Sequence, residues 1–334
     1  MKKIIFFAAA MLALLTTSCS NDDIQIDYNT RNTDVNVTVS LSNFFSGYNY
    51  NDTRNGISVT EDYRTFNSEF GYYIHVRTMF YNSQGNLVDS LVTFTSTTNA
   101  VTKSLKLAEG TYTVISTLNF SESDNADGTL WEWCDREKLS TTYIEPYSRF
   151  SIWAIMSYAS QTIQVKEGSA TTISMTPAPI GALGYLYFQN FQYKNESTYG
   201  TVADNGIREL ALYSQNVADG YRLDPGASEK FIYQKATGAG SWYYLSDQLT
   251  PARFENSKDY GYFRTNIYSY FYILAPQFNY AFGYELEGDS GFNVGAQSNA
   301  TISNGKTYLA YWDWFKVGEP YFGIADNNHW NTYK

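Results

Sequence analysis

The chain has 334 residues, which at roughly 150 residues per domain indicates two domains, each large enough to bury a core without disulfide staples. Its formal net charge is -10 with no block of Lys or Arg, which excludes nucleic acid as a main ligand and argues against electrostatic docking on anionic lipid. The 31 Tyr and 21 Phe are typical of pleated, half-buried strands, so the composition predicts β-structure.

The first residues have the layout of a secretory signal peptide. Lys2 and Lys3 precede an unbroken apolar run from Ile4 to Leu15, and small residues lead up to Cys19. That run is shorter than the roughly 20 apolar residues that span a membrane. We therefore expect residues 1–18 to be removed on export.

The cleavage region, Ser18 followed by Cys19, resembles the lipobox of bacterial lipoproteins, with Leu15 one place earlier than usual. The resemblance implies that Cys19 receives diacylglycerol and becomes the first mature residue. The stretch Asn21–Asp23 resembles a tag that exports some lipoproteins, which implies a lipid-anchored outer-membrane protein exposed at the cell surface. An ordinary signal peptide with a chance cysteine is the alternative.

Only Cys134 is left once Cys19 carries lipid, so no intramolecular disulfide is possible. No histidine stands near Cys134 in sequence to activate a thiolate. We expect Cys134 to be a small, half-buried apolar residue.

The first part of the mature chain reads as a linker, a strand and a loop. Residues 19–33 are polar, which predicts a flexible linker. From Val35 to Leu41 apolar and polar residues alternate, which predicts a half-buried strand. Asn43–Glu69 is rich in Asn, Gly, Ser and Tyr, which predicts a long surface loop with a short strand at Ile57.

Three hairpins are expected next, because pairs of alternating stretches flank turn residues. On the first strand, from Tyr72 to Phe80, His75 is predicted to face solvent. Thr111–Phe120 shows the most regular alternation in the chain. The expected pairs are Tyr72–Phe80 with the strand from Leu87, Val101–Leu107 with Thr111–Phe120, and Gln161–Val165 with Thr171–Met175.

The motif that begins at Leu107 and contains Gly110, Tyr112 and Val114 resembles the L-x-x-G-x-Y-x-V hairpin of transthyretin-like sandwiches. Tyr112 and Val114 are two apart, so both face the core. The motif also recurs in fimbrillin-like lipoproteins, the pilus subunits and anchors of Gram-negative anaerobes. Resemblance to that family implies two tandem seven-stranded transthyretin-like (Greek-key) β-sandwich domains.

The domain boundary is predicted near residue 180, because Pro177 and Pro179 lack the donor that a central strand needs. Residues 34–180 would form the N-terminal sandwich and 181–334 the C-terminal one. Asn304 to Leu309 resembles the turn-then-Tyr hairpin around Tyr112. The strands expected in the second half are Tyr185–Phe191, Ile207–Tyr213, Phe231–Tyr233, Trp242–Leu245, Asn266–Leu274, Tyr280–Leu286, Asn299–Ile302 and Thr307–Trp314.

The family resemblance implies a fimbrial (pilus) subunit, anchor or tip-like adhesin that assembles by β-strand addition. Its partners would be other pilus subunits or host and glycan ligands, with membrane contact through the N-terminal lipid only. Polymerising subunits of that family are cut after an arginine. Arg31, Arg54 and Arg64 are candidates, but only cleavage at Arg54 or Arg64 would remove the strand from Val35 to Leu41, and we favour the uncut role.

The alternative function is a surface glycan-binding lipoprotein that serves an outer-membrane sugar importer. Its platform for stacking on sugar rings would be either the pair Trp131 and Trp133 or the pair Trp312 and Trp314. The aromatic tracts from Tyr260 to Tyr284 serve either the core and cross-strand pairing, or an exposed platform for sugar rings or a partner subunit, and the sequence leaves both open.

Motifs for catalysis are weak, and the interpretation is a protein that is not an enzyme and uses no cofactor or metal. Gly288–Gly291 contains the letters of a serine-protease motif, but His75 lies mid-strand and Phe292 replaces the expected second glycine. Asn125–Gly128 imitates part of a calcium loop, but Cys134 occupies the position that requires Glu. Carboxylate pairs for glycoside hydrolysis, with Glu132 and Asp313 as candidates, stay open because distant strands assemble them.

Overall fold

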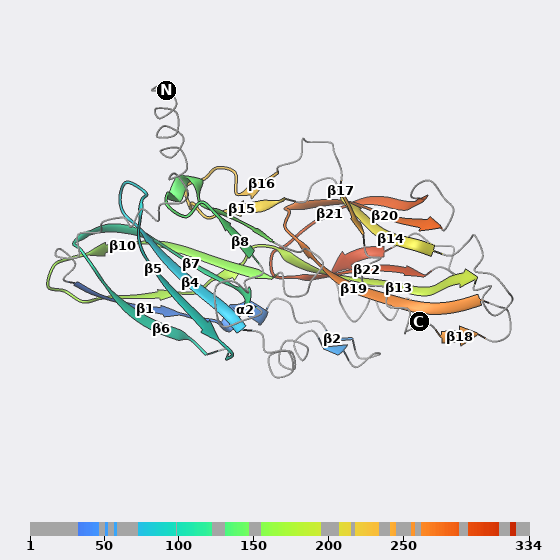
Figure 1. The fold of residues 1–334 in the computed structure, drawn as a ribbon, viewed down its shortest axis with the longest axis horizontal. Helices are drawn as coiled ribbons and strands as arrows, with labels where there is room; N and C mark the ends of the chain where they lie inside the picture. The colour runs from blue at the N-terminus through green and yellow to red at the C-terminus, as the bar shows by residue number, and fades with distance from the viewer. Residues whose placement is uncertain are drawn as a thin grey trace, which may run out of the picture.

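The computed structural model describes residues 33–46, 51–52, 57–58, 73–97, 99–121, 131–146, 155–194, 207–214, 218–233, 241–244, 255–257, 262–286, 293–313 and 321–324. Within these ranges, helix is confined to α2 (Ser42–Ser46) and the 3-10 turn η3 (Leu139–Thr141), and nearly everything else is strand. The predicted all-β class is confirmed (Figure 1). No helix in the described ranges is long and apolar enough to cross a membrane.

The first half of the chain forms two facing sheets. One has three strands, in the order β11 (Thr171–Met175), β1 (Thr33–Val39) and β6 (Val101–Leu107). The other has five, in the order β12 (Ala178–Pro179), β10 (Met156–Val165), β7 (Gly110–Ser121), β4 (Tyr73–Tyr81) and β5 (Leu87–Thr95).

The core of this half lies between the two sheets. Val37 and Val39 on β1 line the same narrow gap as Val76 on β4 and Leu91 on β5. Tyr112 and the other apolar residues at alternate positions of β7 are buried as predicted. The opposite face of β4 is buried as well, so the five-stranded sheet is covered on both sides at this strand.

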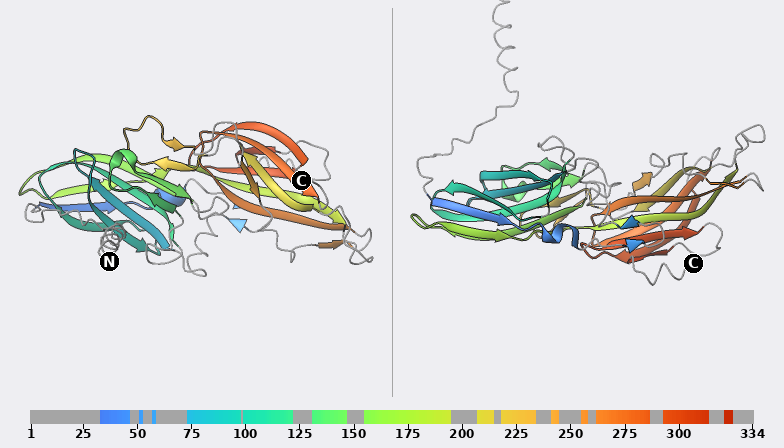
Figure 2. Two further views of the ribbon diagram at one scale, coloured as in Figure 1. Left: turned by 45° about the horizontal axis from the view of Figure 1, so that its top comes forward. Right: turned by 90° about the horizontal axis from the view of Figure 1, so that it is seen from below.

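The second half forms another pair of sheets, which lie in two layers beyond the first pair (Figures 1 and 2). Its five-stranded sheet has the order β18 (Glu255–Ser257), β19 (Tyr262–Ile273), β13 (Ala182–Lys194), β22 (Thr307–Asp313) and β23 (Tyr321–Ile324). Its four-stranded sheet has the order β17 (Ser241–Tyr244), β14 (Ile207–Ser214), β20 (Gln277–Leu286) and β21 (Asn293–Thr301). All eight strands expected in this half are present.

The two halves share one strand arrangement. In each, the first strand lies inside a sheet and pairs in parallel with a strand from the end of that half: β1 with β11, and β13 with β22. On its other side each first strand has an antiparallel neighbour, β6 or β19. The sheets contain more strands than the seven predicted per half, because short edge strands such as β12 and β18 are added.

Of the three predicted hairpins, one is confirmed and two are wrong. β4 and β5 pair directly across the turn Asn82–Asn86. By contrast, β6 lies in the three-stranded sheet while β7 lies in the five-stranded one, and β10 and β11 are separated in the same way. The supposed hairpin at Tyr308 is also wrong, because β21 and β22 lie in different sheets. The turns after β6, β10 and β21 carry the chain from one sheet of the sandwich to the other. The two strands that each turn connects therefore belong to different sheets and do not pair through backbone hydrogen bonds.

A four-stranded sheet joins the two halves, in the order β16 (Phe231–Ile232), β15 (Gly220–Arg222), β9 (Tyr143–Pro146) and β8 (Trp131–Cys134). β8 and β9 belong to the first half, whereas β15 and β16 lie between β14 and β17 of the second. We call residues 218–233 the strap. The small strands β2 (Asn51–Asp52) and β3 (Ile57–Ser58) pair with each other.

The chain passes between the halves at a tight junction. Gly305 donates a backbone hydrogen bond to Gly181 (2.7 Å), and Leu183 donates one to Lys306 (2.9 Å). Gly305 has φ +71°, and a Cβ there would lie 3.0 Å from Pro179 Cγ, so glycine is required both by conformation and by space. The β21–β22 turn of the second half is therefore held against the end of the first.

Candidate functional site

The first described strand, β1, fills a slot between two other strands. It pairs antiparallel with β6 from Thr33 to Val39 and parallel with β11 from Val35 to Val39. At its end, Ser40 donates a backbone hydrogen bond to Met175 (2.8 Å). Both backbone edges of β1 are thus used in strand pairing.

Every second side chain of β1 is buried in the core of the first half. Val35, Val37 and Val39 are at most 2% exposed, and Leu41 just beyond the strand is 1% exposed. Phe44 on α2 is also buried, with its ring centroid 5.1 Å from that of Phe120. β1, Leu41 and α2 therefore all place apolar side chains in the core of the first half.

The other face of β1 is polar and makes a few side-chain hydrogen bonds and one long ion pair. Ser104 donates to Asn36 (2.6 Å), and the hydroxyls of Thr38 and Thr102 are 3.1 Å apart. The ion pair of Lys106 with Asp34 spans 4.0 Å, and both side chains are 63% exposed, so it adds little stability. The alternation predicted from Val35 to Leu41 is confirmed.

Loss of this segment would leave a groove of defined chemistry. The facing edges of β6 and β11 would each carry unpaired N–H and C=O groups, and the core would lose its row of alternate apolar side chains. An extended strand with apolar residues at every second position satisfies both needs, which is the physical basis of strand addition. The arrangement suits exchange of one strand for another.

All of the residues predicted for lipidation and cleavage lie outside the described residues. These are Cys19, Arg31, Arg54 and Arg64. Arg54 stands in sequence between β2 and β3, and both Arg54 and Arg64 follow the segment 33–46. Cleavage at either would therefore separate β1 and α2 from the remainder of the chain.

The four tryptophans do not share a sheet. Trp131 and Trp133 belong to β8, where they pair with Pro146 and Ile144. Trp312 belongs to β22 and pairs with Phe188, and Trp314 lies outside the described residues. The two alternative pairs thus belong to different sheets, and the use of either pair as a platform stays a prediction.

His75 is buried, which corrects the prediction that it faces solvent. It is 0% exposed, its Nδ1 lies 2.8 Å from Asn119 Oδ1, and its ring stacks on Phe94 at 4.8 Å. Burial first, and then the charge of Arg77, lower the pKa of His75 to about 4. The alternation of β4 was read correctly, but both faces of this strand are covered.

A buried His75 argues against a protease site, since no substrate reaches its ring. Asp289 and Ser290 lie outside the described residues. Within the described residues, no group of His, Cys, Asp and Glu is arranged to hold a metal ion.

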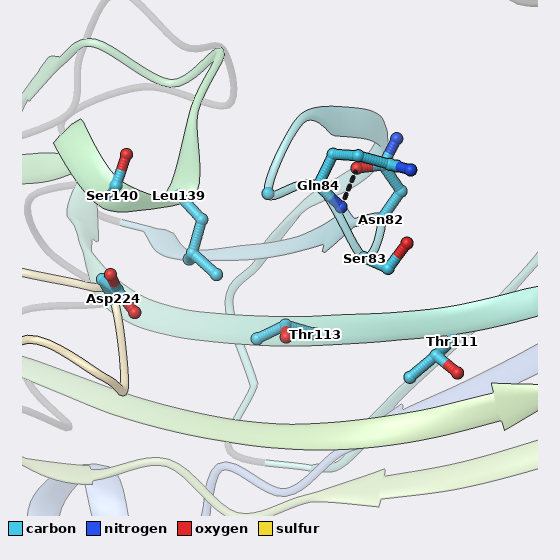
Figure 3. Close-up of a pocket in the computed structure, with 9 residues that line it drawn as sticks. Asn82, Ser83, Gln84, Thr111, Thr113, Leu139, Ser140 and Asp224 are labelled. Carbon is cyan, nitrogen blue, oxygen red and sulfur yellow. Dashed lines mark hydrogen bonds between the residues drawn. The ribbon is translucent and has the colours of Figure 1, made fainter.

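Sequence reasoning missed a polar pocket of about 290 Å³ near the strap. Figure 3 shows Thr111 and Thr113 of β7 beneath it, the β4–β5 turn on one side, and Leu139 and Asp224 on the other. The sequence carries no signal for it, because the residues come from segments that are far apart and individually ordinary.

Comparisons with known proteins find similarity in structure only. No known family model matches the sequence, and no curated protein matches it. The fimbrial anchor protein Mfa2 from Porphyromonas gingivalis is 11% identical with a TM-score of 0.43, covering 87% of this chain and 95% of that one. The tip fimbrial protein Mfa3 from the same organism, with a C-terminal truncation, is 9% identical with a TM-score of 0.37, covering 88% and 99%.

A fimbrial assembly protein from Parabacteroides distasonis is 8% identical with a TM-score of 0.37, covering 87% of this chain and 97% of that one. The structure is thus similar to fimbrial anchor, tip and assembly proteins at low sequence identity. Similarity of this degree assigns no function, so the proposal below depends on residues of this chain.

Proposed function

We propose that this protein is a surface-exposed lipoprotein that acts as a fimbrial anchor or tip-like adhesin and joins other subunits by β-strand addition. The observation that carries the proposal is the position of β1: the first described strand of the chain lies inside a sheet, between β6 and β11. Another strand could take the place of β1, because β1 is held mostly by main-chain hydrogen bonds and contacts the core with every second side chain. Catalysis has no part in this role.

The lipid would set the orientation of the molecule. With diacylglycerol on Cys19, residues 20–32 connect the membrane to β1 and span at most about 45 Å when fully extended. The first half would then stand next to the membrane and the second half would point away from it. We also propose that residues 34–180 and 181–334 act as two domains.

Retention of β1 decides between the fimbrial roles. A chain that keeps its lipid also keeps β1, so its own slot is occupied, and strand addition would then use the slot of the neighbour or another sheet edge. Such a chain ends a polymer, as an anchor or tip does. Cleavage at Arg54 or Arg64 would remove lipid and β1 together and open the groove, which defines a polymerising subunit, whereas cleavage at Arg31 would leave β1 in place.

The test is the mature N-terminus of protein purified from the cell surface. Mass spectrometry should find Cys19 as the first residue, with the mass of its lipid. An N-terminus beyond Arg54 would reject the anchor role and leave the polymerising subunit. A Cys19→Ala variant should be released from the membrane fraction, and equal retention would reject the lipid anchor.

A further inference from the structure

The pocket beside the strap lies where the two halves of the chain meet. Its lining residues are Asn82, Ser83, Gln84, Gly85, Thr111, Thr113, Leu139 and Ser140 from the first half, and Asp224 from the strap of the second half. Its volume of about 290 Å³ is at the lower end of the range for small-molecule sites. Any ligand in it would touch both halves.

The polar groups of the pocket are available to a ligand. Among the described residues, the side chains of Ser83, Gln84, Thr111, Thr113 and Ser140 make no hydrogen bond with one another or with the rest of the protein. Hydroxyls donate and accept, and a carboxamide does both through separate atoms. The lining thus offers hydrogen-bond donors and acceptors from the β4–β5 turn, β7 and η3.

The charge of the lining restricts the ligand. Among the described residues that line the pocket, Asp224 is the only ionisable one, and it brings a carboxylate. One of its oxygens accepts from the backbone N–H of Gly226 (2.8 Å). Lys230 of the strap donates to the backbone carbonyl of Asp224 from outside the lining and offsets part of this charge. No described Lys or Arg lines the pocket to pair directly with a phosphate, sulfate or carboxylate, so an uncharged ligand with many hydroxyls fits best.

The walls are held in place before any ligand arrives. Asn82 Oδ1 accepts from the backbone of Gln84 and Asn86, each at 3.0 Å, and Leu139 donates to Gly85 (2.7 Å). These bonds tie the β4–β5 turn to η3. A rigid wall loses little entropy on binding.

The strap holds the remaining wall. Leu223 donates to Thr142 (3.1 Å), and its carbonyl accepts from the Tyr158 hydroxyl (2.7 Å). Tyr221 pairs with Ile144 of β9 and packs edge-on against Tyr158. Asp224 is therefore placed at the pocket by docking of the second half on the first.

We propose that this pocket binds a neutral saccharide, with hydroxyl and amide groups of the first half and the Asp224 carboxylate of the strap as its hydrogen-bond partners. Because the strap completes the site, saccharide binding stabilises the docked strap, and docking favours binding to the same degree. The proposal deepens the adhesin part of the proposed function and does not depend on strand addition or on the lipid.

The test uses residues 20–334, the proposed mature chain without its lipidated Cys19, and saturation-transfer NMR with methyl α-glucoside, methyl α-mannoside, methyl β-galactoside, lactose and maltotriose. At least one of these should bind, and glucose 6-phosphate should bind at least ten-fold more weakly than methyl α-glucoside. Thr113→Val removes one hydroxyl and should weaken binding about five-fold. Thr171→Val, a half-buried threonine at the start of β11 and away from the pocket, is the matched control and should leave binding unchanged.

Hydrogen exchange provides a second readout, since the bound saccharide should slow exchange of the Leu223 amide. The proposal is overturned if no neutral sugar binds, if the phosphate binds as well as the neutral sugar, or if Thr113→Val and Thr171→Val behave alike. Binding of an extended peptide in preference to every sugar would also overturn it. None of these results bears on the mature N-terminus, so this proposal and the fimbrial one fail separately.

Discussion

The two halves of this protein use one strand arrangement, but the strand that fills the sheet is linked to the chain differently in each half. β1 and β13 each lie inside a sheet, parallel to a late strand of their half. β13 is joined to other structure on both sides, through β12 before it and β14 after it, whereas nothing described precedes β1. The proposed strand exchange therefore concerns β1 of the first half and not β13 of the second.

The largest expected effect is that of cutting the chain after β1. With a tobacco-etch-virus protease site in place of residues 53–56, release of the segment 33–46 should unfold the first half. Each buried side chain of the segment contributes about 1.5–3 kcal/mol, and together they approach the stability of a whole domain. Loss of near-ultraviolet circular dichroism on separation of the fragments measures it.

A synthetic peptide of residues 33–46 should restore the spectrum at one-to-one stoichiometry, and a scrambled peptide should not. The matched control places the same protease site between β13 and β14, where cleavage leaves β13 attached to β12. That cut should leave the fold intact. If the protein without β1 keeps its melting temperature, β1 does not stabilise the first half and this prediction is wrong.

Phe44→Ala should weaken the hold on β1 without cutting the chain. Removing a fully buried phenylalanine typically costs about 3–5 kcal/mol, here by emptying the space against Phe120. Urea unfolding gives the free energy. Tyr233→Ala, at a side chain that is 43% exposed, is the control and should change it by less than about 1 kcal/mol. Equal effects would contradict the anchoring role of Phe44.

His75 should make the first half sensitive to acid. Its pKa is lowered to about 4 in the folded protein from an ordinary 6.5, so the unfolded state binds the proton first as pH falls. Stability should drop between pH 6.5 and 4 by up to about 3 kcal/mol. His75→Gln should reduce this dependence, measured as the difference between the two proteins in urea melts at each pH. Parallel curves would show that His75 does not titrate with unfolding.

The smallest effects compare the two turn tyrosines. Tyr112 donates to the carbonyl of Ala108 (3.0 Å), whereas Tyr308 donates to that of Thr301 (3.2 Å) and also accepts from the backbone of Ser303 (2.8 Å). Tyr308→Phe should therefore cost about 1–2 kcal/mol and Tyr112→Phe about 1 kcal/mol. Thermal melts test the order, and a larger loss for Tyr112→Phe would reverse the comparison.

Local patterns in the sequence were enough to place most strands and the turns between them. Period-two alternation located β1, β4 and β7. The motifs at Tyr112 and Tyr308 correctly marked turns, although the strands on either side of each turn do not pair with each other. Alternation reports which residues of a strand share a face. It does not report the neighbouring strand, which is why β6 with β7 and β10 with β11 were mistaken for hairpins.

The sequence by itself determined an all-β chain, its alternating strands and the apolar residues of its first core. Tertiary structure alone decided that β1 is central, that His75 is buried, and that the strap carries Asp224 onto the other half. These features depend on pairing between segments far apart in the chain. Such pairing is set by the combined burial and main-chain hydrogen bonding of whole sheets, and no short window of residues contains it.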